Sequence, residues 1–179
     1  MATVRPARID DAAAMGRVHV RAWQVAYRGQ MPDEYLDGLS TEDRAKMWSN
    51  ALARRDDSRP TLVAIDHDEQ VVGFAAVGPA ADAPGTGELY AINIDPHRWG
   101  RGYGRALLAT AEVELASLGY SEAVLWVLPG NMRARRFYEA AGWTTDGAER
   151  TTEVLGVVVS EIRYRRGLSQ DIGGSARSN

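Results

Sequence analysis

The chain reads Asp95-Pro-His-Arg-Trp-Gly-Arg-Gly-Tyr-Gly-Arg-Ala-Leu-Leu108 directly after an apolar run, Leu89–Ile94. This stretch places three glycines at alternate positions between a predicted strand and a predicted helix. Glycine has no Cβ, so several backbone N–H groups can turn toward one point. A helix N-terminus adds unpaired donors and a partial positive charge. The stretch therefore predicts a cradle for phosphate, and the identity of the phosphate compound decides the function.

Size and composition are typical of one soluble globular domain. The chain has 179 residues, of which 45% are hydrophobic and 25% charged, and its net charge of −3 gives no sign of nucleic-acid binding. No apolar run approaches the roughly 18 residues of a membrane helix, and the N-terminus lacks the apolar core of a secretion signal. The absence of cysteine excludes a disulfide framework, a Cys nucleophile and a thiolate metal site. We expect a cytoplasmic protein with one domain over residues 1–168 and a disordered Gly/Ser-rich tail at 169–179.

Hydrophobic periodicity predicts helices and strands along the whole domain. The expected strands are Thr3–Ala7, Thr61–Ile65, Val71–Val77, Glu88–Ile94, Ala123–Leu128, Trp143–Thr145 and Val154–Tyr164. The expected helices are Asp10–Arg28, Thr41–Arg54, Arg101–Leu118 and a short helix capped by Asn131 and stopped by Gly142. The segments Gly29–Ser40 and Thr144–Glu153 are expected to be irregular.

Other interpretations of the glycine stretch can be weighed within the sequence. A glycine triplet alone is as compatible with a tight turn that binds nothing as with a ligand site. A Walker loop needs Gly-Lys-Ser/Thr, which this chain lacks. A dinucleotide-binding fold needs an acidic residue at the end of the next strand, but that strand ends Trp126-Val-Leu-Pro-Gly-Asn131. Both nucleotide interpretations are therefore disfavoured.

A second motif follows, Asn131-Met-Arg-Ala-Arg-Arg-Phe-Tyr-Glu-Ala-Ala-Gly-Trp143. Together the two motifs resemble the signatures of the GNAT superfamily of acetyl-CoA-dependent N-acetyltransferases. Gly102 and Gly104 match the end of the family's Gln/Arg-x-x-Gly-x-Gly/Ala loop, and the second motif is matched at Asn131, Ala134, Phe137, Tyr138 and Gly142. Two positions depart from the pattern, because Trp99 stands where Gln or Arg is usual and Trp143 replaces Phe. The resemblance spans nearly the whole chain and implies an α/β fold with a mixed, mostly antiparallel twisted sheet flanked by helices on both faces.

The resemblance also implies acetyl-CoA as the donor, coenzyme A as a product, and a small-molecule or peptide amine as the acceptor. Backbone N–H groups of Gly100–Arg105 would hold the pyrophosphate, and the pantetheine arm would lie beside the strand ending at Ile94. A bulge near Ile92–Ile94 would aim the Ile94 N–H at the thioester oxygen. The expected cofactor contacts are Ile92, Ile94, Trp99, Gly100, Arg101, Gly102, Tyr103, Gly104, Arg105, Asn131, Arg133, Phe137 and Tyr138. Of Arg101, Arg105, Arg133, Arg135 and Arg136, only one or two are expected to meet phosphates.

Two residues are candidates for the chemistry that the resemblance implies, which needs no metal. Tyr138 matches the family tyrosine that protonates the departing thiolate, although a tyrosine on an apolar helix face can also be plain core. Glu88 begins the strand before the loop and is the candidate general base. The alternatives for Glu88 are a surface carboxylate at a strand start, or proton removal by a water chain with no single base.

The acceptor side is less defined. Trp23 and Tyr27, with His19, form an aromatic edge that lines an acceptor pocket or packs in the core. Acids at Asp33, Glu34 and Asp37, and in the loop Thr144–Glu153, would suit a cationic acceptor or be ordinary solvated residues. The resemblance also implies a possible homodimer, for which the strand Val154–Tyr164 could pair across an edge. The alternative to an enzyme is a non-catalytic acyl-CoA-binding sensor with the same fold.

Overall fold

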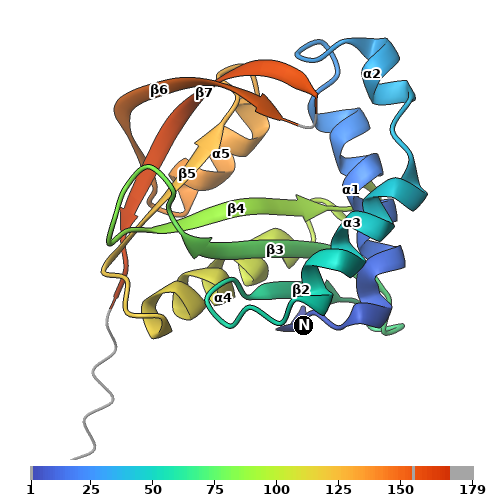
Figure 1. The fold of residues 1–179 in the computed structure, drawn as a ribbon, viewed down its shortest axis with the longest axis horizontal. Coiled ribbons are helices and arrows are strands. Elements are labelled where there is room, and N and C mark those ends of the chain that lie inside the picture. The colour runs from blue at the N-terminus through green and yellow to red at the C-terminus, as the bar shows by residue number, and fades with distance from the viewer. Residues whose placement is uncertain (1, 155, 170–179) are drawn as a thin grey trace, which may run out of the picture.

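The computed structural model describes residues 2–154 and 156–169, so the predicted tail, apart from Ser169, lies outside the described residues. Seven strands form one sheet in the order β1-β2-β3-β4-β5-β7-β6 (Figure 1). Their bounds are β1 Thr3–Pro6, β2 Thr61–Ile65, β3 Val71–Pro79, β4 Gly87–Ile94, β5 Glu122–Val127, β6 Thr144–Val154 and β7 Val157–Gly167. All neighbouring strands are antiparallel except β4 and β5, which are parallel. The predicted mixed, mostly antiparallel sheet is confirmed.

Helices cover both faces of the sheet, as predicted. Side chains alternate along β2, so Leu62 and Ala64 join one apolar cluster while Val63 joins another on the opposite face. The first cluster is covered by α4 (Tyr103–Ser117) and α5 (Met132–Ala140). The second is covered by α1 (Ala12–Ala26) and α3 (Thr41–Ala53). Within the described residues, no helix is long and apolar enough to cross a membrane.

The parallel strands β4 and β5 meet only at their beginnings. Their paired residues are Gly87 with Ala123 and Glu88 with Val124, and beyond these pairs the two strands diverge (Figure 1). An extra residue in β4, Tyr90, interrupts the register with β3 immediately after this point. Because a bulge bends its strand, it helps to turn β4 away from β5.

The predicted position of this bulge, Ile92–Ile94, is wrong. These residues pair in regular register with Gly73–Ala75. The extra residue is Tyr90, whose partly exposed phenol donates a hydrogen bond to the Pro79 carbonyl oxygen. With Tyr90 left out of the alternation, Leu89 and Ile92 both pack in the cluster beneath α4. A period-of-two reading of the sequence has no signal for this shift.

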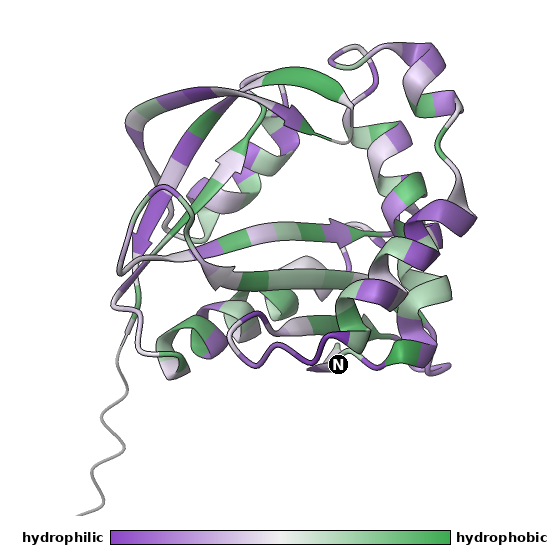
Figure 2. Cartoon of the chain, viewed as in Figure 1, coloured by the Kyte–Doolittle hydropathy of each residue, from purple (hydrophilic) through white to green (hydrophobic). Residues whose placement is uncertain are grey.

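The predicted loop Thr144–Glu153 is also wrong, because this segment is the outer strand β6. It pairs with β7 and contains an irregularity between Thr145 and Glu149 where Gly147 has φ +81°. Figure 2 shows why the pattern hid a strand, since β6 is mostly hydrophilic. A second difference lies in Gly29–Ser40, which contains a short helix, α2 (Asp33–Asp37).

Candidate active site

The predicted phosphate cradle has the backbone that it needs. A 3-10 turn, η2 (Pro96–Arg98), leads into Gly100 with φ +75° and Gly102 with φ +89°. Gly102 is the N-cap residue of α4, and no side chain caps the helix. Open space surrounds the positions that a Cβ would take on Gly100 and Gly102. The first-turn N–H groups of a 15-residue helix are therefore uncapped and approachable, which fits a phosphate group.

Three contacts hold the segment that precedes the cradle. Asp95 accepts a hydrogen bond of 2.9 Å from Arg21 on α1. Arg98 donates one of 2.9 Å to Asp66, in the turn between β2 and β3. The indole N–H of Trp99 donates one of 3.0 Å to the carbonyl oxygen of Ile94. This segment is thus fixed to α1, to the turn between β2 and β3 and to the end of β4 before the glycines begin.

The free edge of β4 presents backbone groups toward the gap beside β5. The N–H of Asp95 bonds to Val72, so at this residue the ladder points toward β3. Because backbone direction alternates along an antiparallel strand, the N–H and C=O groups of Ile94 and Ile92 point away from β3. β5 does not pair with this part of β4. Ile92 and Ile94 therefore offer main-chain partners to an extended ligand, although Trp99 already bonds the Ile94 oxygen.

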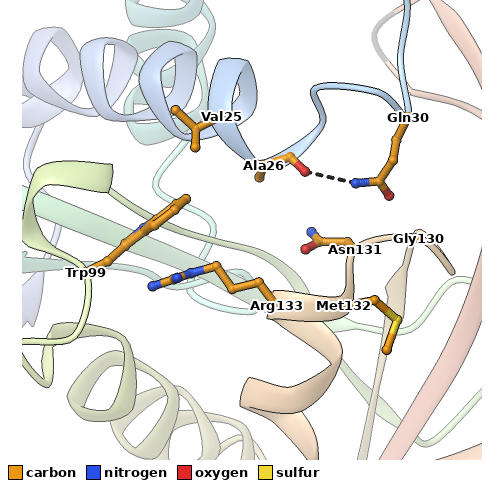
Figure 3. Close-up of a pocket in the computed structure, with 8 residues that line it drawn as sticks. All are labelled: Val25, Ala26, Gln30, Trp99, Gly130, Asn131, Met132 and Arg133. Carbon is orange, nitrogen blue, oxygen red and sulfur yellow. Dashed lines mark hydrogen bonds between the residues drawn. The ribbon is translucent and has the colours of Figure 1, made fainter.

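A pocket of about 250 Å³ lies between the end of α1 and the start of α5 (Figure 3). Its lining includes three predicted site residues, Trp99, Asn131 and Arg133. The guanidinium of Arg133 lies over the Trp99 ring, 3.8 Å from its centroid. The Asn131 side chain caps α5 by accepting a bond of 3.2 Å from the Ala134 N–H. The second motif is thus brought against the first.

The remaining candidate residues for cofactor binding have different surroundings. Gly104 lies against Phe137, whose ring would be 3.4 Å from an added Cβ, so this glycine joins α4 to α5. Arg101 and Arg105 are exposed at the cradle. Arg135 is engaged elsewhere, because its Nε donates to the Tyr164 hydroxyl and its Nη1 to the Pro129 carbonyl. Tyr103 is half-buried against the main cluster.

Glu88 is buried at the point where β4 and β5 separate. It is only 7% exposed and is the last β4 residue paired with β5. Burial raises the pKa of Glu88 to about 7, and the nearby Arg150 guanidinium limits the rise. A carboxyl group with this pKa can hold or release a proton near neutral pH. The alternative of a solvated surface carboxylate does not fit this burial.

Tyr138 is buried as well, with rings of Phe137, Trp143 and Tyr164 around it. Burial raises its pKa well above the ordinary tyrosine value, and the charge of Tyr27 would raise it further. Burial and the negative charge of Glu161 raise the pKa of Tyr27 to about 12. Tyr138 and Tyr27 therefore both keep their protons across the physiological range.

Sequence reasoning missed three residues near Glu88. Glu161 on β7 is 7% exposed and accepts a hydrogen bond of 2.8 Å from the Nε of Arg150 on β6. The Arg150 guanidinium lies over the ring of Trp126 on β5, 4.2 Å from its centroid. If β6 is assigned as a strand, the pairing of Arg150 with Glu161 can be predicted, because the two residues are cross-strand partners.

The predicted aromatic edge on α1 is split. Trp23 is 7% exposed and packs in a cluster with Leu36 and Val159, while Tyr27 lies at the edge of that cluster. His19 accepts a bond from the Trp48 indole N–H, and burial lowers the pKa of His19 to about 4. The edge is therefore core at His19 and Trp23, whereas Tyr27 is partly buried and packs its ring against Trp23.

The predicted acidic residues of the α2 region lie apart from this group. Asp33 and Asp37 are exposed, and both accept hydrogen bonds from Arg28. Their charges are therefore already partnered at the surface. Glu34 is likewise exposed.

Comparison with known proteins gives a consistent result. The family model described as "Acetyltransferase (GNAT) family" matches residues 20–143. An uncharacterized N-acetyltransferase, YuaI, of Bacillus subtilis (strain 168) is 34% identical over 164 residues, covering 90% of this chain and 91% of that protein. A mycothiol acetyltransferase of Kocuria rhizophila is 38% identical over 92 residues, which are 49% of this chain but only 30% of that protein.

Solved structures share the fold. The PaiA N-acetyltransferase of Thermoplasma acidophilum, solved with coenzyme A, has a TM-score of 0.75 at 21% identity and covers 93% of this chain and 99% of its own. A phosphinothricin acetyltransferase of Sinorhizobium meliloti, solved with acetyl-CoA, has a TM-score of 0.69 at 21% identity, with coverage of 94% and 89%.

Proposed function

Since the chain belongs to the GNAT family of acetyltransferases, we propose that it moves an acetyl group from acetyl-CoA to a primary amine by direct attack in a ternary complex. The acceptor is a small molecule or a peptide. The observation that carries this proposal is the position of Glu88. A buried carboxyl with a pKa of about 7 lies where the open edge of β4 begins, on the path that an acyl group bound along this edge would share with an amine.

The donor site is assigned to the two motifs. The uncapped first turn of α4, with Gly100 and Gly102, would hold the pyrophosphate. The main-chain groups of Ile92 and Ile94 would hold the extended arm, with the Ile94 N–H directed at the thioester oxygen. Asn131 and Arg133 line the adjoining pocket together with Trp99, which precedes the glycines. Bound acetyl-CoA supplies the acetyl thioester, and neighbours with this fold have been solved with coenzyme A or acetyl-CoA.

The proton transfers are assigned to two side chains. Glu88 takes the proton from the acceptor's ammonium group, directly or through one water, so that the amine nitrogen has a free lone pair. The new C–N bond forms as the C–S bond breaks, and the nitrogen then loses its second proton to the solvent, so that a neutral amide remains. Tyr138 donates its phenolic proton to the departing sulfur and regains one from the solvent. Because the pKa of Tyr138 is raised, its phenol is protonated across the physiological range and has a proton to donate.

The proposal is tested by incubating the protein with acetyl-CoA and a panel of amines, amino acids and short peptides. Free thiol and the mass of each amine product are followed together. We expect one equivalent of thiol for each acetylated amine. Acetyl-CoA at about 100 times its Kd should also raise the Tm by roughly 5–10 °C, whereas NAD and ATP should not. A shift with acetyl-CoA and no acetylated product from any amine would leave a sensor of the same fold and overturn the enzymatic proposal.

A further inference from the structure

Three arginines lie on the sheet face that carries Trp126, and they are not used alike. Arg163 directs both Nε and Nη2 at Asp146. Arg165 likewise directs Nε and Nη2 at Glu122. Arg150 differs, because within the described residues the only hydrogen bond of its side chain runs from Nε to Glu161. Two of the three guanidinium forks are thus filled by the chain's own carboxylates, and that of Arg150 is not.

The Arg150 guanidinium is nevertheless held in place. Glu161, which is 7% exposed, fixes the Nε side at 2.8 Å. The ring of Trp126 supports the guanidinium face at 4.2 Å. About a third of the Arg150 side chain remains exposed. A planar guanidinium that is fixed on one side and on its face, with its Nη donors unused, is prepared to bind an oxyanion such as a carboxylate.

Two observations place this group beside the reacting centre. Glu88 pairs with Val124 on β5, and the Arg150 guanidinium lies over Trp126, two residues further along the same face of that strand, where its charge opposes the rise in the pKa of Glu88. The indole N–H of Trp126 is buried and has no hydrogen-bond partner among the described residues. This donor belongs to the ring that lies beneath the Arg150 guanidinium. The two features indicate a site for an oxygen-bearing ligand next to the proposed base.

We propose that Arg150 determines acceptor specificity by binding a carboxylate that lies close to the reactive amine of the acceptor. The acceptor class is then an amino acid or a compound with the same zwitterionic arrangement. Its ammonium group faces Glu88 and its carboxylate meets the Nη groups of Arg150. Glu161 is a positioning residue that holds the guanidinium. This inference rests on the proposed acetyl transfer, and it narrows the small-molecule and peptide amines considered above to acceptors with a nearby carboxylate.

The test compares each free L-amino acid with its C-terminal amide, which keeps the amine and removes the carboxylate charge. We expect the best free amino acid to exceed its amide by about 10- to 100-fold in kcat/KM, the range for a hydrogen bond to a charged group. In Arg150→Gln this preference should disappear through a higher KM for the acid, with the amide little changed. Arg150→Lys should restore part of the preference, because the charge returns without the fork.

Arg165→Gln is the matched control, since it removes an arginine from the same strand face whose fork is already filled by Glu122. It should keep the acid preference of the unsubstituted protein. If Arg150→Gln does not fold, the ratio of acid to amide in the unsubstituted protein still decides. Amides acetylated as well as acids, or no amino acid acetylated although other amines are, would overturn the role of Arg150 and leave acetyl transfer intact. No transfer to any amine would instead remove the proposed function itself.

Discussion

Trp99 donates its indole N–H to the carbonyl oxygen of Ile94 at 3.0 Å, which connects the glycine loop proposed to bind phosphate to the free edge of β4. The same indole ring supports Arg133 at the opening of the pocket. Trp99 occupies a position that the family pattern gives to Gln or Arg, so this chain replaces a polar side chain with a bridge between three elements. The ring and the N–H make separate contributions that substitution can separate.

Trp99→Ala should weaken acetyl-CoA binding by about two- to fivefold, because a stacked arginine contributes about 0.5–1 kcal/mol at a partly exposed site. Trp99→Phe keeps a ring beneath Arg133 and releases only the Ile94 oxygen, so its Kd should stay within about twofold of the original. Calorimetric titration of both variants gives the comparison. Equal losses in the two variants would show that the hydrogen bond, and not the stacking, is what binding needs.

Gly102→Ala and Gly119→Ala form a matched pair at the two ends of α4. Both glycines have positive φ, +89° and +95°, and neither has an atom near its Cβ position. Each substitution should cost roughly 1–2 kcal/mol of stability from left-handed backbone strain. Only Gly102→Ala should also weaken acetyl-CoA binding, because only its methyl group stands at the proposed phosphate site. Equal Kd values for acetyl-CoA in the two variants would show that the phosphate does not bind at this loop.

The pH dependence of activity should report Glu88. Because burial raises its pKa to about 7, the base is protonated and inactive below that pH. The value of kcat/KM should rise tenfold per pH unit below about pH 7 and level off above it. Glu88→Gln should lower kcat by about 100-fold or more and abolish this rise. A rise that persists unchanged in Glu88→Gln would assign the titration to another group and favour a water chain.

The pH dependence of the folding stability tests the raised pKa of Glu88 independently of activity. The pKa of Glu88 is higher in the folded chain than the 4.5 of the free side chain, so the protonated carboxyl group contributes to the free energy of unfolding. This contribution is complete below about pH 4.5 and is lost as pH rises through about 7. Glu88→Gln should therefore gain stability over the unsubstituted protein as pH rises from 4.5 to 8, measured by Tm. A difference that does not change with pH would mean that Glu88 is not buried in solution.

Tyr138→Phe separates binding from catalysis. The substitution keeps the ring that packs against Trp143 and removes the hydroxyl group. We expect the Kd for acetyl-CoA to stay within about twofold, while kcat falls by roughly 100-fold, the lower range for a general acid. Unchanged turnover at neutral pH would leave Tyr138 as a core residue only.

Local signals were strong where backbone geometry and short motifs decide the structure. The left-handed glycines, the Asn131 cap and the apolar strands follow from a few consecutive residues, and the structure contains them. The outer strand β6 lacks an apolar pattern because it consists mostly of Thr and charged residues, of which Asp146 and Arg150 form ion pairs with Arg163 and Glu161 on β7. Arg150 and Glu161 are 11 positions apart, and only the hairpin brings them together. The bulge at Tyr90 likewise depends on pairing that no local pattern records.

Direct transfer within a ternary complex is tested most plainly by initial rates measured with both substrates varied, together with the intact mass of the enzyme. Double-reciprocal plots should intersect, and the enzyme mass should not change in the presence of acetyl-CoA alone, because Glu88 and Tyr138 act on protons and form no bond to the acetyl group. Parallel lines, together with an enzyme about 42 Da heavier, would contradict this account, because that is the mass added when one acetyl group replaces a hydrogen in a covalent acetyl-enzyme.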